Sequence, residues 1–445
     1  MNHDKMFMRA TQTTRKWFVF ALVCLVSAAV ALHAEPQEIA SSLTLDKVVT
    51  EALQNNPQIH AMRAKWEAMK ERPVQERTLP NPMLTYSAMD MVNGGNWPDT
   101  QEKRVGVEQP FPWFGKLGLK GKVAEKEAET MQREYEAMQR EVVMMVKEDY
   151  YDLYAVQRSL AITRTEEDVL KQMQKIAETK YGTGEVTQQD VLKAQAEITM
   201  LEARILEMEQ QEIVLKAKLN QLLNRRADSP LGLAVTEPQR GFDANPEQLF
   251  ELAEKNRPEI KGATAQIQRN QYERDLMKKE FFPDYRLGVE YRNVGVDWSG
   301  FTRSDNMLML TIGVDLPIWQ TKYRAGVREA EKMIESGQAG LEAVGKQISF
   351  DVQDASFKLL TARRTFDLYK LSLIPQAEAR FSASEAGYRT GKTSFLDLLE
   401  SERFLLNARV MAAMAEGNLG MEAARLERAI GTDLKPAVQP EGEKK

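Results

Sequence analysis

The sequence predicts an α+β fold made of two structural repeats, each with one β-hairpin and one long helical hairpin. The first observation is a duplicated block, because residues 181–192 and 388–399 share Tyr, Thr, Gly, Asp and a final Leu at matching places. The second is that apolar spacing switches from helical to strictly alternating after a proline in each half of the chain. The third is that helical spacing then continues through residues 117–181 and 323–388, far further than a globular core needs.

The N-terminus has the pattern of a secretory signal peptide, residues 1–34. Basic residues precede an apolar run over residues 17–32, and small residues then predict cleavage after Ala34 or Ala31. The run is short for a membrane-spanning helix, which is the alternative interpretation. The only cysteine, Cys24, lies inside the run, so the mature chain is expected to have no disulfide and no thiolate chemistry.

Composition narrows the possible partners and compartments. The 445-residue chain has a net charge of −5 and is 43% hydrophobic, which does not indicate a nucleic acid or another polyanion as partner. After residue 34 no apolar run is long enough for a transmembrane helix. An exported chain of this kind is expected to be soluble in the periplasm, secreted, or inserted in a membrane as a β-barrel. Residues 433–445 are expected to form a disordered tail.

Each repeat is expected to begin with helices that are separated at a proline. The break falls at Pro57 in the first repeat, which we place at residues 35–231, and at Pro258 in the second, at residues 232–432. Pro73 should also kink the next helix of the first repeat, a feature that the second repeat lacks.

The β-hairpins are predicted at about residues 83–111 and about residues 285–317. Alternate residues of a strand face opposite sides, and in a membrane the apolar side meets lipid while the charged side meets water. The apolar side carries Tyr285, Leu287, Val289 and Tyr291, and the charged side carries Arg286, Glu290 and Arg292. Residues 92–102 and 293–306 are rich in Gly, Asn, Asp and Ser, and they predict loops between the paired strands.

The helical hairpins are predicted at about residues 117–224 and about residues 323–430. At each tip a glycine ends the first helix, and a Thr or Ser can cap the second. The tip residues are Thr183 and Gly184 in the first repeat and Thr390 and Gly391 in the second. Apolar residues step by three and four with charges between them, which predicts coiled-coil packing along a path of about 100 Å.

Several residue groups that suggest chemistry have a simpler explanation. Acidic pairs such as Glu148-Asp149 and Glu166-Glu167 are interpreted as solvated helix faces. Gly391-Lys392-Thr393 looks like the end of a phosphate-binding loop, but Ala386 stands where the first glycine should be. The methionines, including Met307 and Met309, are interpreted as core fillers rather than as a soft-metal site. The sequence therefore predicts no enzyme activity, no cofactor and no resident metal.

Two architectures are compatible with four strands in each chain. A four-stranded sheet is too small to close into a barrel, and a bilayer does not tolerate open sheet edges. Several chains would then have to share one barrel, and three chains would supply twelve strands. The alternative is a soluble periplasmic coiled-coil scaffold whose short strands make a small β domain. The strand periodicity by itself favours neither.

The doubled pattern resembles the TolC-like outer membrane efflux protein family. The resemblance covers residues 43–432, and its most specific pieces are Leu79-Pro80-Asn81-Pro82, the segment Gln-Pro-Phe-Pro-Trp-Phe-Gly-Lys at residues 109–116, and the two tips. The 109–116 segment is most similar to the branch that serves heavy-metal cation exporters of the resistance-nodulation-division class.

This resemblance implies an architecture and a set of partners. It implies a homotrimer in the outer membrane of a Gram-negative bacterium, with a shared twelve-stranded β-barrel in lipid and a long α-helical coiled-coil tunnel in the periplasm. It also implies docking to a periplasmic adaptor, or membrane fusion protein, and to an inner-membrane resistance-nodulation-division pump. The expected function is a passive export duct, with heavy-metal cations as the favoured cargo and organic compounds or drugs as the alternative.

The resemblance further implies a gate at the periplasmic tips. Asp397 and Glu400 lie three residues apart on a helix, so threefold symmetry would turn them into two carboxylate rings that line the aperture. Tyr388 and Asp190 would bond across neighbouring helices to keep the aperture shut. The alternative is that Asp190 and Asp397 only sit in the first turn of a helix, where a carboxylate favours the helix dipole. The first repeat has Lys193 where the second has Glu400, so the acidic pair belongs to the second repeat.

Overall fold

The structure is a computed structural model that describes residues 42–89, 102–235, 245–298 and 301–434. The expected signal peptide, nearly all of the expected tail and most of the expected 92–102 loop lie outside these residues. The chain divides into a small unit, residues 1–43 with 230–233, and a large unit that holds the rest. In the small unit, the Leu43 amide donates to the Leu233 carbonyl at 2.9 Å. All elements below belong to the large unit.

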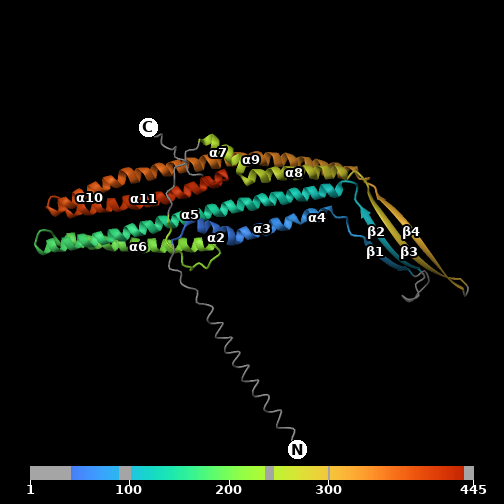
Figure 1. Cartoon of the computed structure of the whole chain (residues 1–445), viewed down its shortest axis with the longest axis horizontal. Coiled ribbons are helices and arrows are strands. Elements are labelled where there is room, and N and C mark those ends of the chain that lie inside the picture. Colours follow the sequence, from blue (N-terminus) through green and yellow to red (C-terminus); the bar gives the residue numbers. More distant parts are fainter. Residues whose placement is uncertain (1–41, 90–101, 236–244, 299–300, 435–445) are drawn as a thin grey trace, which may run out of the picture. The chain divides into compact units, whose positions relative to one another are not determined.

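The described elements follow the same order twice (Figure 1). The first half contains α2 (Leu45–Asn55), α3 (Pro57–Lys70), α4 (Arg72–Arg77), β1 (Met83–Met89), β2 (Glu102–Phe111), α5 (Lys116–Gly182) and α6 (Gln188–Leu222). The second half contains α7 (Pro246–Asn256), α8 (Pro258–Lys279), β3 (Asp284–Trp298), β4 (Phe301–Asp315), α9 (Gln320–Leu368), the π-helical turn η2 (Tyr369–Leu373), α10 (Ile374–Arg389) and α11 (Phe395–Ile430).

Prolines interrupt the helices of both repeats, and the breaks expected at Pro57 and Pro258 separate α2 from α3 and α7 from α8. The break expected at Pro73 is confirmed, because α3 ends at Lys70 and α4 begins at Arg72, whereas α8 is continuous. The unbroken helix expected over residues 323–388 is wrong, because the turn η2 separates α9 from α10. Pro375 lies in the first turn of α10 and has no N–H to donate to the preceding turn, which accounts for the irregular hydrogen bonding there.

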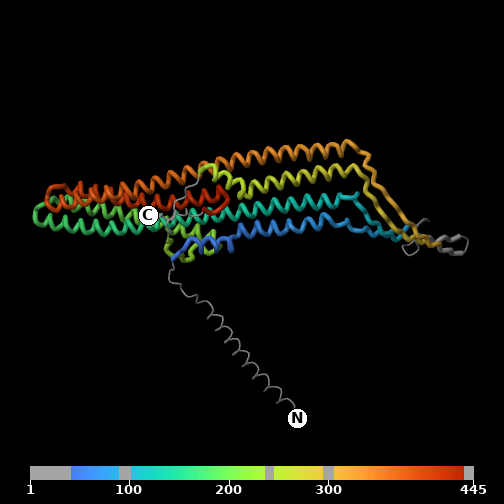
Figure 2. Tube along the Cα trace, turned by 45° about the horizontal axis from the view of Figure 1, so that its top comes forward, coloured from blue at the N-terminus to red at the C-terminus, as the bar shows by residue number. Residues whose placement is uncertain are grey.

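The helices lie side by side in two sets that share α5 and α9 (Figures 1 and 2). Near the strands, α4, α5, α8 and α9 are neighbours in that order, and near the tips the order is α6, α5, α11 and then α9 with α10. Because α5 has 67 residues, its end at the tip lies about 100 Å along the helix from its start beside β2. The long helical hairpins expected from the sequence are present.

The strands form one antiparallel sheet in the order β1-β2-β3-β4. The loop expected at residues 293–306 is wrong, because β3 continues to Trp298, β4 begins at Phe301 and Asn293 pairs with Asn306. The side chains of this last pair are themselves bonded, with Asn293 Nδ2 2.6 Å from Asn306 Oδ1. Continuous pairing with the adjacent strand outweighs the low strand propensity of Gly, Asn and Asp in this segment.

The two faces of the sheet differ in polarity, as alternation along β3 predicted. On one face Arg286 donates to Asp315 at 2.6 Å, and Arg292 lies 2.5 Å from Glu102. The opposite face is apolar and exposed, with Leu308 and Leu310 more than 70% accessible. Other residues of this face are Leu84, Tyr86, Val105, Val107, Leu287, Val289, Tyr291 and Ile312. An exposed apolar surface of this extent indicates contact with lipid or with another protein.

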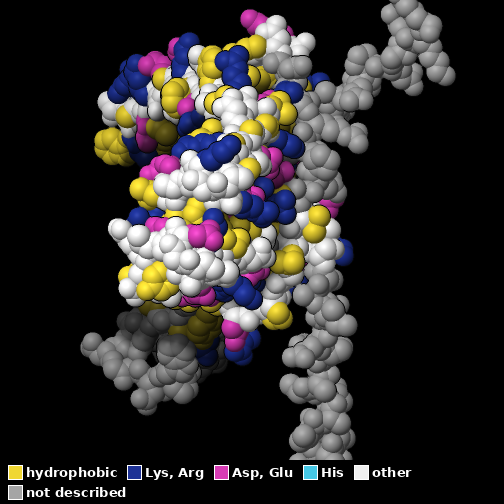
Figure 3. Space-filling view, turned by 90° about the vertical axis from the view of Figure 1, so that its left-hand side faces the viewer, with side chains coloured by type: hydrophobic (Ala, Val, Ile, Leu, Met, Phe, Trp, Pro, Cys, Tyr) yellow, Lys and Arg dark blue, Asp and Glu magenta, His cyan; other side chains and the backbone are white. Residues whose placement is uncertain are grey.

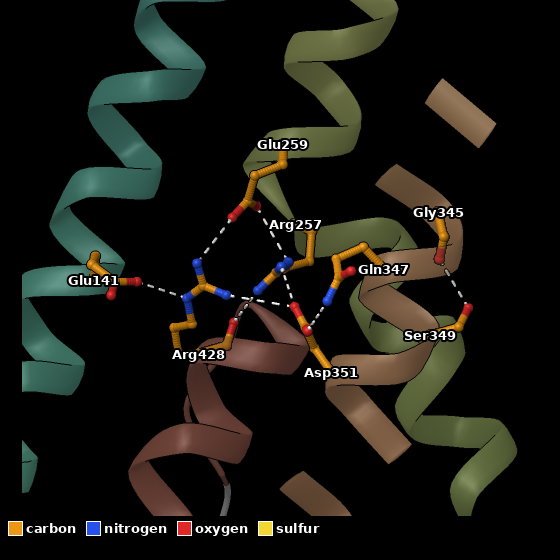
Figure 4. Close-up of polar contacts among 8 residues, drawn as sticks. All are labelled: Glu141, Arg257, Glu259, Gly345, Gln347, Ser349, Asp351 and Arg428. Carbon is orange, nitrogen blue, oxygen red and sulfur yellow. Dashed lines mark hydrogen bonds and ion pairs between the residues drawn. The ribbon is translucent and has the colours of Figure 1, made fainter. Parts of the chain in front are cut away.

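The start of each repeat is bonded to the end of its last helix. In the first repeat, Asn56 Nδ2 donates to the carbonyl of Leu222 at 2.9 Å. In the second, Arg257 Nη1 donates to the carbonyl of Arg428 at 3.0 Å (Figure 4). Both side chains precede the proline that begins a helix, and both donate to a carbonyl in the last turn of the final helix of their repeat, where carbonyls lack the usual donor one turn further on.

The second of these junctions is an ion-pair network around the buried Arg257 (Figure 4). Arg257 is 3% exposed and lies 3.3 Å from carboxylate oxygens of both Glu259 and Asp351. Arg428 donates to Glu141 of α5 at 2.9 Å and lies 3.7 Å from Glu259 and from Asp351. The network thus connects α5, α8, α9 and α11.

Loss of Arg257 should therefore destabilise the fold. Arg257→Ala leaves Glu259, Asp351 and a helix-end carbonyl without their buried donor, and we expect a loss of about 3 kcal/mol in the free energy of unfolding. Arg63→Ala is the matched control, because the Arg63–Glu67 pair is exposed and its loss should change stability far less. Denaturant unfolding of the purified protein measures both; equal effects would contradict a structural role for Arg257.

Candidate functional site at the helical tips

Both tips end their first helix with the same glycine-centred turn. Gly184 has φ 76° and Gly391 has φ 73°, the left-handed conformation that only glycine adopts readily. In the second tip, the Gly391 amide donates to the Tyr388 carbonyl at 3.2 Å, and the Lys392 amide donates to the Gly387 carbonyl at 2.8 Å. The first tip has the matching pair of bonds at 3.0 and 2.9 Å. This is the Schellman arrangement, which satisfies the last carbonyls of a helix.

The threonines of the tips support these turns. Thr183 Oγ1 donates to the Lys180 carbonyl at 3.0 Å and also lies 3.0 Å from Glu185 Oε1. Thr390 Oγ1 lies 3.1 Å from the carbonyls of Ala386 and Gly387. The tip residues named from the sequence therefore lie within the turns themselves.

Asp397 serves as a helix-capping residue in this chain. Its amide donates to Ser394 Oγ at 3.1 Å, while Ser394 Oγ donates to Asp397 Oδ2 at 2.7 Å and the Ser394 amide lies 3.4 Å from the same oxygen. This reciprocal pair is a capping box. Glu400, one turn further on, is exposed. The pKa of Arg403 is raised mainly by its hydrogen bond to Glu197, and the charge of Glu400 raises it further.

Asp190 has a different role from Asp397. The expected cap oxygen of Thr187 makes no side-chain bond in α6. Instead, the Asp190 amide donates to the Thr187 carbonyl at 3.1 Å, and the Asp190 carboxylate lies 3.8 Å from Lys193 Nζ. The Asp190 carboxylate is thus partly neutralised by the residue that replaces Glu400 in the first repeat.

Tyr388 is buried between the two tips. Only 5% of it is exposed, its ring lies 5.4 Å from that of Phe395, and Lys180 Nζ sits 5.0 Å from the ring centre. Lys180 Nζ also donates to the Tyr388 carbonyl at 3.2 Å, so it ties the first tip to the second. Sequence reasoning missed Lys180, because its partners lie on the other hairpin and leave no local pattern.

The bond expected between Tyr388 and Asp190 is not formed within this chain. Among the described residues, the buried Tyr388 hydroxyl has no hydrogen-bond partner. Burial raises the pKa of Tyr388, and the nearby charges of Asp190 and Glu185 raise it further. Asp190 is therefore close enough to act on the buried hydroxyl electrostatically, although no hydrogen bond joins them.

The surface seen from the tip end carries charges of both signs. Figure 3 shows Lys and Arg side chains interspersed with Asp and Glu over this side, with hydrophobic side chains between them. A single chain therefore presents no large field of one sign here, and any acidic ring would need the symmetric repetition of Asp397 and Glu400.

Behind the tips, three glutamates lie in the interior, and this corrects an expectation. Glu166 was expected on a solvated face, but it is 2% exposed and lies 2.5 Å from Arg409. Glu197 of α6 binds Arg403 of α11. Glu402 of α11 is fully buried, and among the described residues neither of its carboxylate oxygens has a hydrogen-bond partner.

The acidic pair Glu148-Asp149 is also less solvated than expected. Glu148 lies 2.5 Å from Arg425 of α11, and burial raises the pKa of Asp149 to about 6. The helix pattern gave no signal for this, because the covering surface comes from helices distant in the sequence. Among the described residues, no helix combines the length and the apolar composition that crossing a membrane requires.

Replacing a tip glycine should strain the turn. Gly391→Ala places a side chain at a φ of 73°, and we expect a loss of about 1–2 kcal/mol together with faster hydrogen exchange at the tip. Gly182→Ala is the control, because an added Cβ there meets no atom within 4 Å and alanine favours the helix. Unfolding and hydrogen-exchange measurements should show a loss for Gly391→Ala only. The same loss in both variants would mean that the turn conformation is not the cause.

Known proteins resemble this chain over nearly its whole length. The cobalt-zinc-cadmium resistance protein CzcC of Cupriavidus metallidurans is 21% identical over 403 residues, which cover 89% of this chain and 92% of CzcC. The solved structure of CusC matches with a TM-score of 0.75 at 17% identity, over 90% of this chain and 95% of that one. VceC of Vibrio cholerae matches with a TM-score of 0.73 at 17% identity, over 88% and 97%.

CusC and VceC share the fold of this chain although few of their residues are identical to it. The family described as outer membrane efflux protein matches residues 48–225 and 249–432, one segment in each half. Since the two segments together span most of the chain, this protein belongs to the outer membrane efflux protein family.

Proposed function

We propose that this protein is the outer membrane channel of a tripartite efflux system and exports heavy-metal cations passively from the periplasm. The observation that carries the proposal is the four-stranded sheet with one exposed apolar face and one charged face. A surface of this kind suits a wall that has lipid on one side and water on the other. The soluble scaffold alternative gives no reason for so much exposed apolar surface at one sheet.

The edges of the sheet support assembly from three chains. β1 and β4 are its outer strands, and each leaves one row of backbone N–H and C=O groups without a neighbouring strand in the part of the chain that the structure describes. A bilayer does not tolerate such edges, so β4 of one chain would pair with β1 of the next. Three copies give a closed, twelve-stranded barrel, and the helices of three chains then continue as a periplasmic tunnel.

The energy for export would come from partners. A duct of this kind works with a periplasmic adaptor and an inner-membrane pump of the resistance-nodulation-division class. The helical tips, about 100 Å of helix away from the sheet, are the part that would meet those partners. No enzymatic role is proposed, since the family is one of channels.

The favoured cargo is heavy-metal cations. The relative CzcC is named for cobalt, zinc and cadmium resistance, and the segment 109–116 resembles the heavy-metal branch of the family. Organic compounds remain the second candidate, as the resemblance to the TolC-like family implies. The specificity of such a system is expected mainly in its pump.

Deletion of the gene should distinguish the two cargo classes. We expect the deletion strain to become sensitive to divalent heavy-metal salts, and its resistance to dyes, detergents and antibiotics to stay at the parental level. A plasmid copy of the gene should restore metal resistance. If the deletion strain were sensitive to organic compounds only, heavy-metal cations would be excluded as the cargo and organic compounds would be favoured.

The gate can be tested without disturbing the helix cap. Asp397→Asn with Glu400→Gln removes both charges, yet Ser394 still caps α11 and the asparagine Oδ1 can still accept from the Ser394 amide, so the fold should be retained. In planar bilayers we expect lower cation selectivity and weaker block by trivalent cations than in the parent. Glu202→Gln, an exposed carboxylate of α6, is the control. Unchanged selectivity in the double variant would leave Asp397 as a capping residue only.

Tyr388 is tested separately, because its hydroxyl has no hydrogen-bond partner among the described residues. Tyr388→Phe should leave the unfolding free energy of the chain unchanged within about 0.5 kcal/mol, since no intramolecular bond is lost. If the hydroxyl bonds Asp190 of a neighbouring chain in the closed trimer, Tyr388→Phe and Asp190→Ala should each raise conductance. Combining them should add little, because both remove the same bond. Parental conductance in both variants would remove this pair from the gate.

A further inference from the structure

The most unusual polar group in the described chain is Glu402. It lies on α11 between Leu398 and Leu399 on one turn and Leu405 and Leu406 on the next, and all four leucines are buried. Leu398, Leu399 and Leu406 belong to an apolar cluster with residues of α5 and α6 beneath the tips, and Leu405 packs in a smaller cluster with Ala377 of α10. A carboxylate in such a place loses its hydration without gaining a hydrogen bond, whereas a protonated carboxyl group is neutral.

The charges around Glu402 also favour its protonated form. Glu166 faces it from α5 and Glu197 faces it from α6, and both raise the pKa of Glu402, after burial as the largest cause, to about 8. These two glutamates are already bound to Arg409 and Arg403 of α11. Arg403 lowers the pKa of Glu402, but its hydrogen bonds go to Glu197.

The remaining charged groups at this level do not neutralise Glu402. On α10, Glu378 lies 3.0 Å from Arg409, so this arginine is shared between two carboxylates, and α11 itself places exposed Glu400 near Arg403. Two arginines therefore meet several glutamates, and among the described ones Glu402 has neither a hydrogen bond nor contact with solvent. Each of the other acids has either a cationic partner or solvent.

We propose that Glu402 is a proton-binding site that holds α11 against α5 and α6, so that the tip end of the helical bundle loosens when the proton leaves. The proposal rests on the proposed channel function only for its consequence, opening of the duct. The proton passes from the Glu402 carboxyl group to water, and the carboxylate that remains repels Glu166 and Glu197 and requires hydration. Alkaline periplasm would then favour the looser state.

The helix beside the site has a place where it can bend. The π-helical turn η2 borders a hollow of about 550 Å³ whose walls include Glu166 and Arg409. A π-turn interrupts regular helical bonding, and such turns are common at kinks. When Glu402 ionises, α10 and α11 can move as a hairpin about η2 while α9 keeps its contacts near the sheet.

The sign of the pH effect follows from the direction of the shift. The pKa of Glu402 lies above the ordinary value of 4.5, so the folded state binds the proton more tightly than the unfolded state does. Between those two pKa values, stability is highest at low pH and falls as pH rises towards about 8. Asp149, whose pKa is raised to about 6, titrates in the same range, so only a difference between variants isolates Glu402.

The test compares the full assembled protein in detergent with Glu402→Gln between pH 6 and 9. Glutamine has the same shape and no charge, so its thermal midpoint should exceed that of the parent by an amount that grows by roughly 5 °C as pH rises. Glu207→Gln, an exposed carboxylate of α6, should track the parent. If Glu402→Gln misfolds, Glu402→Leu replaces it. A constant difference at every pH would overturn the proton site.

A second measurement tests the consequence. In planar bilayers the conductance of the parent should rise several-fold between pH 6 and 9, while Glu402→Gln stays at its low-pH value throughout. A parallel rise in both would overturn the link between Glu402 and opening. No conductance in either protein would contradict the channel function itself, whereas the thermal comparison would still decide whether Glu402 binds the proton.

Discussion

The bond between the start of each repeat and the end of its last helix is the constraint on which the rest of the large unit depends. Asn56 and Arg257 occupy the same place before a helix-starting proline, and each donates to a terminal carbonyl, of Leu222 or of Arg428. A hairpin with a long helix such as α5 could slide along its partner by whole turns, since its apolar stripe repeats. A directional bond at one end fixes the register, and the tips are placed accordingly.

The junction between sheet and helices joins the two repeats to each other. Lys116, at the start of α5, is 3% exposed and lies 2.9 Å from Asp284 Oδ1 at the start of β3. The Trp113 amide donates to the same oxygen at 2.7 Å, and the Trp113 ring stacks on that of Phe282 at 5.1 Å. The family-specific segment at residues 109–116 therefore binds the first repeat to the second. Because β2 pairs with β3 just beyond it, this contact sets the direction in which the sheet leaves the helices.

Charged residues inside the tip half of the bundle divide into two kinds. Most are ion pairs between helices, such as Glu197 with Arg403, and their burial is compensated by a partner. Among the described residues Glu402 has no such partner, and burial raises its pKa to about 8. In our proposal this acid makes the packing beneath the tips sensitive to pH, which apolar contacts alone would not do.

The sequence by itself determined the elements, their order and the polarity of each sheet face. It could do so because these depend on local signals: prolines break helices, the glycines of the tips need positive φ, and alternation separates Leu287 from Arg286. Prediction from the sequence failed where a local preference was outweighed by a contact with a segment distant in the chain. The Gly- and Asn-rich segment after Asn293 is strand because β4 pairs with it, and Pro375 is accommodated by a π-turn within a long, packed helix.

Only the tertiary structure decided what the charged residues do. Glu166 and Glu402 belong to helices whose sequences are dense in charge, and nothing in their spacing separates them from solvated glutamates such as Glu207. Burial comes from surfaces on α5, α6 and α11, which are far apart in the chain. The partner of each charge likewise comes from another helix, as Lys180 reaches Tyr388 across the two tips. The energy of a charge depends on its surroundings in space, and those surroundings exist only once the helices are packed.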